Sequence, residues 1–314
     1  MTIQNVVLIG AGGNIGSHIL AALTAANFNV TILSLASSKS SFPDHKVVTV
    51  ADDYPHADLV AAFKGQDAVV SPVTITPGYQ KIDGTGQYSF INAAIEAGVQ
   101  RYIPSEFGHD HRNAASVELS ELIAEKAKVF RYLESKQSQI SWTIVPSGPF
   151  YDFDLKIGFC GINVKENKAT VTAGGNTKYS CSTMPQVGDA VAAILKHDKE
   201  TANQFVNLES FATTQNETLA LVQKVTGKEF AVEHQSGEVL IEGSKAGIKA
   251  GNFFANYGLI QAADFIPGYG AEWSEEAAKW RQILGLKRLD HEAETARILK
   301  EIETQPGPGF SMSF

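Results

Sequence analysis

Three glycines near the start of the chain have the spacing to bind the phosphates of a nucleotide. Gly10, Gly13 and Gly16 follow an apolar segment at 5–9 that predicts a strand, and they lead into a segment that predicts a helix. A diphosphate needs close backbone N–H donors and the positive end of a helix dipole. Gly10 would form the tight turn. Gly13 would let the backbone approach the diphosphate closely, and Gly16 would let the helix pack closely on the strand. A glycine turn can also serve only to reverse the chain, and the spacing Gly-x-x-Gly-x-x-Gly differs from the commoner Gly-x-Gly-x-x-Gly. Its position between a strand and a helix favours the phosphate site, which then also includes Gly12, Asn14 and Ile15.

The segment after the second expected strand indicates NADP rather than NAD. Sites for NAD usually carry an acidic residue about 20 positions past the glycines, where it binds the ribose 2′-hydroxyl. Residues 30–36 contain no Asp or Glu, so nothing in that segment would repel a 2′-phosphate. Hydroxyl groups and one cation follow and suit a phosphate, although a solvated polar loop is the alternative. The candidate contacts with the 2′-phosphate are Ser34, Ser37, Ser38 and Lys39.

Four titratable residues follow another expected strand and could carry acid or base chemistry. They are Glu106, His109, Asp110 and His111. We interpret His109 as a contact with the substrate or a proton relay, because imidazole titrates near neutral pH. An exposed polar loop is the alternative. A metal site is disfavoured, because neighbouring residues point in different directions and the sequence shows no second ligand cluster.

Two groups of aromatic residues could form the walls of an apolar pocket. Phe150, Tyr151 and Phe153 could stack on an aromatic substrate, and Phe150 could also contact the cofactor, but all three could equally be core. The segment 251–273 carries several more aromatic residues between glycines and prolines. It could be a lid over the pocket or plain core.

Apolar segments alternate with helical patterns over the first half of the chain, which indicates an α/β fold. This alternation predicts a Rossmann-type, doubly wound parallel sheet, with ligands in the crevice at the carboxyl ends of the strands. The crevice would be formed by residues 71–77, 105–111 and 147–151. The expected strands are 5–9, 29–34, 46–50, 67–73, 100–103 and 140–145, and the expected helices include 57–64, 85–97 and 119–135.

The alternation stops after residue 151, where we expect a second unit. Residues 1–150 would form the NADP-binding Rossmann domain. Residues 151–314 would form mainly a smaller, mixed α/β substrate-binding lobe, with part of 180–210 returning to the Rossmann sheet. Within this lobe, Thr214 and Glu217 form a predicted capping box for a helix that Gly227 ends.

Charge and composition narrow the classes of partner. The 314 residues include 26 Lys and Arg and 34 Asp and Glu, a net charge of −8, which disfavours nucleic acids and anionic membranes. Cys160 and Cys181 have no zinc-site spacing, and a core of this size needs no disulfide. The first strand begins almost at Met1, and no apolar segment is long enough to span a membrane. We expect a soluble, cytoplasmic monomer or homodimer with no metal.

Several of these motifs, taken in order, resemble one family. The glycine turn, the segment Arg-Tyr-Ile-Pro-Ser-Glu-Phe-Gly at 101–108 and the helix that carries Lys126 and then Phe-Arg-Tyr-Leu-Glu at 130–134 are similar to the NmrA-like and isoflavone-reductase-like branch of atypical short-chain dehydrogenases. The resemblance continues in general layout at 187–191 and 216–228. It implies NADPH-dependent reduction of small aromatic, often phenolic, molecules. The family often has Arg at the end of the second strand, where this chain has Leu35, so Lys39 and the serines would have to bind the 2′-phosphate instead.

The resemblance also implies that Lys126 is the catalytic lysine and contacts the cofactor. Its ammonium group could bind ribose hydroxyls or stabilise negative charge on a substrate oxygen. Tyr132 and Lys136 match the Tyr-x-x-x-Lys pair of ordinary short-chain dehydrogenases. Lys136 lies only 10 positions before Pro146 and Lys126 lies 20 positions before it, so Lys126 is better placed to reach the crevice.

Two functions remain open at this point. The first is an NADPH-dependent reductase of an aromatic or conjugated metabolite, a product of secondary metabolism. The second is a sensor of the NADP redox state that regulates a partner without chemistry. Lys126 and the aromatic second lobe favour the enzyme, and the sequence contains no hydrolase Gly-x-Ser-x-Gly or kinase-type phosphate loop.

Overall fold

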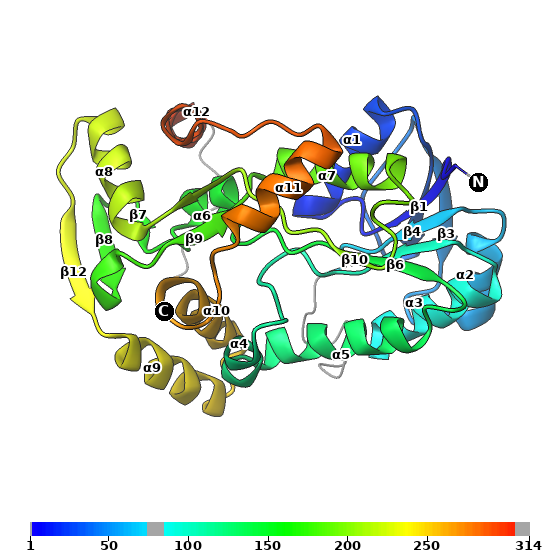
Figure 1. The fold of residues 1–314 in the computed structure, drawn as a ribbon, viewed down its shortest axis with the longest axis horizontal. Helices are drawn as coiled ribbons and strands as arrows, with labels where there is room; N and C mark the ends of the chain where they lie inside the picture. Colours follow the sequence, from blue (N-terminus) through cyan, green and yellow to red (C-terminus); the bar gives the residue numbers. More distant parts are fainter. Residues whose placement is uncertain (1, 74–84, 305–314) are drawn as a thin grey trace.

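The computed structural model describes residues 2–73 and 85–304 and arranges them as two groups of elements (Figure 1). The larger group surrounds a seven-stranded sheet in the order β10-β6-β5-β4-β1-β2-β3, in which every pairing is parallel. Its strands are β1 (Asn5–Ile9), β2 (Asn29–Leu35), β3 (Lys46–Val50), β4 (Ala68–Val70), β5 (Arg101–Ile103), β6 (Ser141–Ile144) and β10 (Gln204–Phe205).

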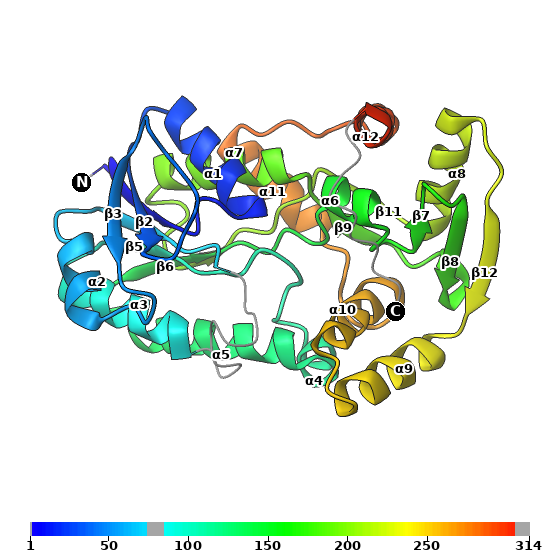
Figure 2. The ribbon, with the colours of Figure 1, turned by 180° about the vertical axis from the view of Figure 1, so that it is seen from behind.

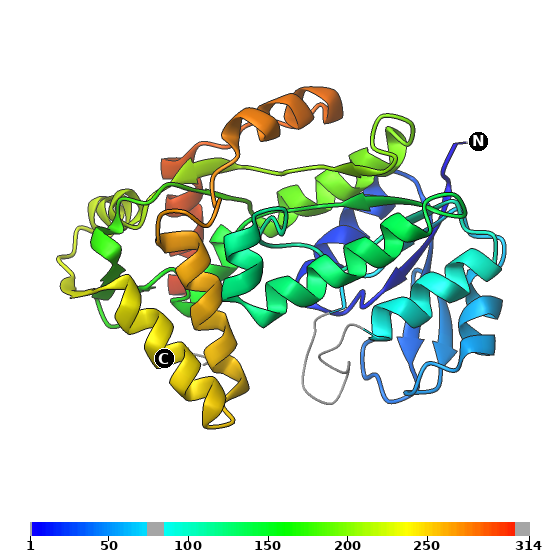
Figure 3. The ribbon, with the colours of Figure 1, turned by 60° about the horizontal axis from the view of Figure 1, so that its bottom comes forward.

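Helices cover both faces of this sheet, which is why its central strands are almost continuously apolar. The alternation of side chains along β1 shows the two layers. Val6 and Leu8 pack in one core with residues of α1 and α7, whereas Val7 and Ile9 pack in another with residues of α2, α3 and α5. Figure 1 shows the first pair of helices above the sheet, and Figure 3 shows the second set from below. These helices are α1 (Asn14–Ala25), α2 (His56–Phe63), α3 (Thr85–Glu96), α5 (Glu121–Ser135) and α7 (Met184–Lys196).

The smaller group contains two short sheets and most of the remaining helices (Figure 2). One sheet has the order β12-β8-β7 and the other pairs β11 with β9. Tyr151, Tyr179 and Phe211 belong to its separate core. Its strands are β7 (Ile162–Asn163), β8 (Lys168–Thr172), β9 (Tyr179–Cys181), β11 (Phe211–Thr213) and β12 (Ala231–Gln235). Its helices are α6 (Tyr151–Ile157), η1 (Ala173–Gly175), α8 (Gln215–Thr226), α9 (Gly237–Lys249), η2 (Phe253–Ala255), α10 (Asn256–Phe265) and α12 (His291–Thr304).

Local signals in the sequence account for several boundaries. The capping box is confirmed at α8, where Thr214 and Glu217 each bond the other's backbone N–H, and Gly227 ends the helix with φ +66°. The expected helix 119–135 is divided at Ser120, which separates the short α4 (Ala114–Leu119) from α5. With its parallel sheet and second mixed unit, the structure confirms the predicted fold class.

The chain passes between the two groups more than once. After β9, α7 packs along α1 and β10 joins the sheet beside β6. Further on, Leu284 at the end of α11 (Ser274–Leu284) packs in the first core. Residues 74–77 of the expected crevice and 305–314 of the expected second lobe lie outside the described residues. Within 2–73 and 85–304, no helix has both the length and the apolar character needed to cross a bilayer.

Candidate active site

The glycine turn after β1 leaves the start of α1 open. Gly10 has φ +81°, and its carbonyl oxygen accepts a hydrogen bond from the N–H of Gly13 at 3.0 Å. A Cβ at Gly16 would lie 2.0 Å from that same oxygen, so only glycine allows this packing. Gly13 caps α1 without a side chain, and α1 carries no acidic residue in its first turn. The backbone N–H groups at the start of α1 are therefore available to an anion.

The loop after β2 folds against this turn. A Cβ at Gly12 would lie 2.5 Å from the hydroxyl oxygen of Ser40. The backbone N–H of Ser37 donates a hydrogen bond to a carboxylate oxygen of Asp52 at 3.0 Å. An acidic residue that follows β3 therefore lies beside the loop after β2, although residues 30–36 contain no acid. The expected 2′-phosphate contacts lie in this loop and at the end of β2, and none of them lines the cavity described next: Ser34, Ser37, Ser38 and Lys39.

A cavity of about 370 Å³ begins at the glycine turn and reaches both groups of elements. Gly13, Asn14 and Ile15 form one part of its lining, and Lys126 and His109 form another. Most of the remaining lining is apolar or aromatic, as expected for a site that binds a small organic molecule. These residues include Phe107, Leu122, Ile123, Phe150, Phe153, Ile157, Phe159, Phe254, Tyr257 and Ile260.

Lys126 reaches this cavity from α5. A Cβ at Gly108 would lie 3.2 Å from its Nζ, so the ammonium group rests against the backbone that follows β5. Burial lowers the pKa of Lys126, and the negative charge of Glu106 opposes that change. Lys136 lies at the end of α5, with its Nζ 5.5 Å from the ring centre of Tyr132, and neither residue lines the cavity. The structure thus separates the two candidate lysines as the sequence argument expected.

His109 is held between two groups from the second half of the chain. Its Nε2 lies 2.9 Å from the carbonyl oxygen of Tyr269, so Nε2 carries the hydrogen. Its Nδ1 faces Asp264 Oδ1 at 3.3 Å. Burial by itself lowers the pKa of His109, but the hydrogen bond and charge of Asp264 raise it overall. His109 is therefore a fixed, buried imidazole in the cavity wall.

The alternative interpretation of residues 106–111 as an exposed polar loop is wrong, because the structure buries their side chains. Asp110 accepts hydrogen bonds from Arg112 and from Asn207, the latter at 2.8 Å. His111 lies 3.2 Å from Glu106 and packs beside aromatic rings of α5 and β10. These contacts join the loop after β5 to its neighbours. In the described part of the chain, no three His, Cys, Asp or Glu side chains form a cluster suited to a metal ion.

The expected aromatic residues divide between the cavity and the core. Phe150 and Phe153 line the cavity, whereas Tyr151 is buried and its hydroxyl lies 2.6 Å from Thr295. In the segment 251–273, Phe254 and Tyr257 line the cavity. Phe265 and Trp273 are buried, whereas Phe253 and Tyr269 are partly exposed. This segment therefore forms part of the cavity wall, and its action as a lid stays a prediction.

Two acids in the wall were missed by the sequence reasoning. Asp154 on α6 and Asp264 on α10 both line the cavity and are almost fully buried. Burial, together with nearby Asp264, raises the pKa of Asp154 well above its ordinary value. A signal was available for Asp264, because it is the one acid in the otherwise uncharged α10. Nothing in the local sequence shows that Asp154 turns toward a cavity.

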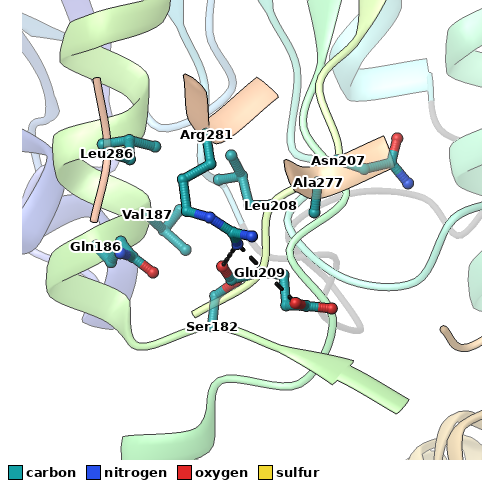
Figure 4. Close-up of a pocket in the computed structure, with 9 residues that line it drawn as sticks. All are labelled: Ser182, Gln186, Val187, Asn207, Leu208, Glu209, Ala277, Arg281 and Leu286. Carbon is teal, nitrogen blue, oxygen red and sulfur yellow. Dashed lines mark hydrogen bonds and ion pairs between the residues drawn. The ribbon is translucent and has the colours of Figure 1, made fainter. Parts of the chain in front are cut away.

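A second hollow is filled by the protein itself. It measures about 10 Å³ and lies between α7, residues 207–209 and α11 (Figure 4). Arg281 points into it, donates to the Glu209 carbonyl oxygen at 3.1 Å and lies 3.9 Å from the carboxylate of the same residue. This ion pair connects α11 to the segment between β10 and β11, and the remaining volume is too small for a ligand.

Comparison with known proteins identifies a single family. The model of the NmrA-like family matches residues 2–271. The oxidoreductase aprR of Aspergillus flavus is 37% identical over 304 residues, which cover 96% of this chain and 100% of that protein. The isoflavone reductase homolog IRL of Zea mays is 31% identical over 256 residues, covering 76% of this chain and 80% of that protein.

Solved structures show the same fold. The structure of AtPrR2 with NADP⁺ and (+)pinoresinol superposes with a TM-score of 0.77 at 21% identity, covering 95% of this chain and 99% of that one. The predicted resemblance to the NmrA-like and isoflavone-reductase-like proteins is confirmed.

Proposed function

The chain belongs to the NmrA-like family, and we propose that it is an NADPH-dependent reductase of an aromatic or conjugated small molecule. One observation carries this proposal: a single cavity joins the open start of α1 to Lys126 and to an aromatic wall. The oxidoreductase aprR and the maize isoflavone reductase homolog add support by name.

The residues around the glycine turn fit NADPH. A Cβ at Gly13 would meet the backbone oxygen of Gly10 at 3.3 Å and no side chain within 4 Å. The uncapped N–H groups of α1 suit a diphosphate. Binding of NADP⁺ by AtPrR2, which shares the fold, supports the same cofactor here. When bound, NADPH supplies the hydride for the reduction. The residues that would hold it are Gly10, Gly12, Gly13, Asn14, Ile15, Gly16, Ser34, Ser37, Ser38, Lys39, Lys126 and Phe150.

Lys126 and His109 would carry the chemistry of the protein. Lys126 would hold a ribose hydroxyl and stabilise negative charge that develops on a substrate oxygen, because it is a partly dry cation in the cavity wall. His109 would contact the substrate or pass a proton, since its imidazole is fixed by Tyr269 and Asp264. Phe150 and Phe153 would stack on the aromatic part of the substrate.

The test is oxidation of NADPH in the presence of aryl enones, with benzalacetone and its hydroxylated derivatives as probes. We expect loss of nicotinamide absorbance with at least one probe and slower loss with NADH. Cofactor binding by calorimetry accompanies each assay. Tight binding of NADPH with no reduction across a broad panel of enones, quinones and phenolic ethers would refute the reductase and favour the redox sensor.

A further inference from the structure

The loop after β5 holds a buried acid that the proposed reaction does not use. Glu106 is 2% exposed and does not line the cavity. Its Oε2 lies 3.2 Å from His111 Nε2, but neither buried atom has a well-aligned hydrogen bond to any residue that the structure describes. A buried carboxylate is costly unless a nearby positive charge stabilises it.

Two contacts place Glu106 on the side of α5 that carries Lys126. His111, which faces the carboxylate, packs on Phe130 with ring centres 5.4 Å apart. Phe130 follows Lys126 by four positions, so their side chains share one face of α5. A Cβ at Gly108, two residues after Glu106, would lie 3.2 Å from Lys126 Nζ. The carboxylate and the ammonium group therefore lie against the same face of the helix.

The backbone on which Lys126 rests is fixed. The carbonyl oxygen of Gly108 accepts hydrogen bonds from the N–H groups of Ser147 and Gly148, each at 3.0 Å, which tie the loop after β5 to the loop after β6. Lys126 Nζ forms no hydrogen bond or ion pair with another described residue, so Glu106 acts on it through space. Burial lowers the pKa of Lys126, and the charge of Glu106 raises it.

Other titratable groups lie near this part of the cavity. On α5 itself, the buried carboxylate of Glu125 forms an ion pair with the exposed Lys128. The negative charge that raises the pKa of Lys126 comes from Glu106. The remaining titratable groups of the described wall are His109 after β5, Asp154 on α6, and Tyr257 and Asp264 on α10.

We propose that Glu106 is a positioning residue whose buried carboxylate holds Lys126 as an ammonium ion facing the cavity. Lys126 would contact the substrate, and Glu106 would affect the reaction only through this lysine. The ammonium charge is what would stabilise negative charge on the substrate oxygen, and a neutral amine lacks it. The inference rests on the proposed function, because Lys126 is the lysine of that reaction.

The first test measures the pKa of Lys126 without cofactor or substrate. Lys126 is partly exposed and lines the cavity, so trace amounts of acetic anhydride can reach it. The acetylation of its peptide, followed by mass spectrometry across a range of pH, gives the pKa. Glu106→Gln keeps the size of the side chain and removes its charge, so the pKa of Lys126 should fall by about one pH unit or more. Glu106→Asp keeps the charge but withdraws it by one methylene, so the fall should be smaller.

The matched control is Glu125→Gln, a second buried acid, adjacent to Lys126 on α5. Its partner is Lys128, so this change should leave the pKa of Lys126 unaltered.

The second test is the pH dependence of kcat with a responsive enone. Turnover should decline as the pH rises through the pKa of Lys126, because the ammonium charge is lost there. In Glu106→Gln this decline should begin at lower pH, and the profiles of the variant and the wild type should converge at low pH. A purely structural defect would instead lower kcat at every pH.

The outcomes separate this proposal from the proposed function. An unaltered pKa of Lys126 in Glu106→Gln, or an equal fall in Glu125→Gln, would overturn the role of Glu106. If Glu106→Gln does not fold, Glu106→Asp decides: a fall in the pKa of Lys126 supports the proposal, and no change overturns it. A lower pKa of Lys126 with no shift in the pH dependence of turnover, or with no turnover of any enone, would refute the part of Lys126 in a reductase. The effect of Glu106 on Lys126 would then still stand.

Discussion

Replacing Lys126 with alanine tests whether its ammonium group acts on the substrate. Nζ rests beside Gly108 in the cavity wall, and the described residues give it no ion pair. Two unit charges 4 Å apart interact by about 4 kcal/mol at an effective dielectric constant of about 20. A hydrogen bond to a charged group contributes about 1.5–3 kcal/mol. Burial lowers the pKa of Lys126, so we use the smaller figure, that of the hydrogen bond to a charged group. A loss of about 2.7 kcal/mol in the transition state corresponds to a 100-fold lower kcat/KM.

The assay is steady-state oxidation of NADPH with a responsive enone, beside calorimetric binding of NADPH for each variant. Cofactor affinity should fall much less than turnover, because charge on the substrate oxygen develops mainly in the transition state. Lys136→Ala is the matched control, since this lysine lies on the same helix but contacts the ring of Tyr132 outside the cavity. Near-normal turnover of the Lys126 variant would refute the assignment. A large loss only at Lys136 would transfer the role to Tyr132 and Lys136.

Three further predictions concern the cofactor and the buried acids. Gly13→Val should abolish the binding of NADPH and NADH, measured by calorimetry, without unfolding the chain. The control is Gly243→Val, at a helix position with open space around it, and this variant should bind both cofactors. Normal cofactor affinity of Gly13→Val would show that the turn is purely structural. Lys39→Ala should weaken the binding of NADPH by about 1 kcal/mol and leave the binding of NADH unchanged. Equal losses for both cofactors would refute a contact between Lys39 and the 2′-phosphate. The pKa of Asp154 is raised, so the native state binds the proton of this carboxyl more tightly than the unfolded chain does. Its contribution to the free energy of unfolding therefore falls as the pH rises from 3.8 toward the raised pKa. Asp154→Asn should therefore raise the melting temperature more at about pH 8 than at about pH 5, and an equal effect at both would show that this carboxyl is ionised throughout.

The parts of the fold that local chemistry decides were predictable from the sequence. Strands buried on both faces must be apolar throughout, so the alternation with amphipathic helices identified the parallel sheet. The capping box at Thr214 and the left-handed glycine at Gly227 fixed the ends of α8, because both interactions lie within one helix. The glycine turn was predictable for the same reason, since Gly13 and Gly16 both lie against the carbonyl oxygen of Gly10.

What the sequence could not supply were contacts between distant segments. His109 depends on Asp264 and on the carbonyl of Tyr269, about half the chain away, and neither partner has a motif. Arg101 belongs to the segment that resembles the family, but its guanidinium is buried among Ser141, Thr143 and Thr201 and serves to join strands. Burial lowers its pKa to about 10. A motif therefore shows that a residue matters to the family without showing whether it serves the site or the scaffold.

The charged groups along the cavity favour one placement of cofactor and substrate. At the glycine turn the start of α1 offers backbone N–H groups and no acid, which favours a negatively charged ligand. Along the wall of α6 and α10 stand two acidic groups, the carboxyls of Asp154 and Asp264, which disfavour a second anion. Among the described residues, Lys126 is the one lysine or arginine that lines the same cavity. An anionic dinucleotide and a neutral aromatic molecule would each meet groups of suitable charge in this arrangement. Exchanging their positions would place phosphates against buried acids. The electrostatics of the wall thus support one orientation of cofactor and substrate, with the reacting groups meeting at Lys126.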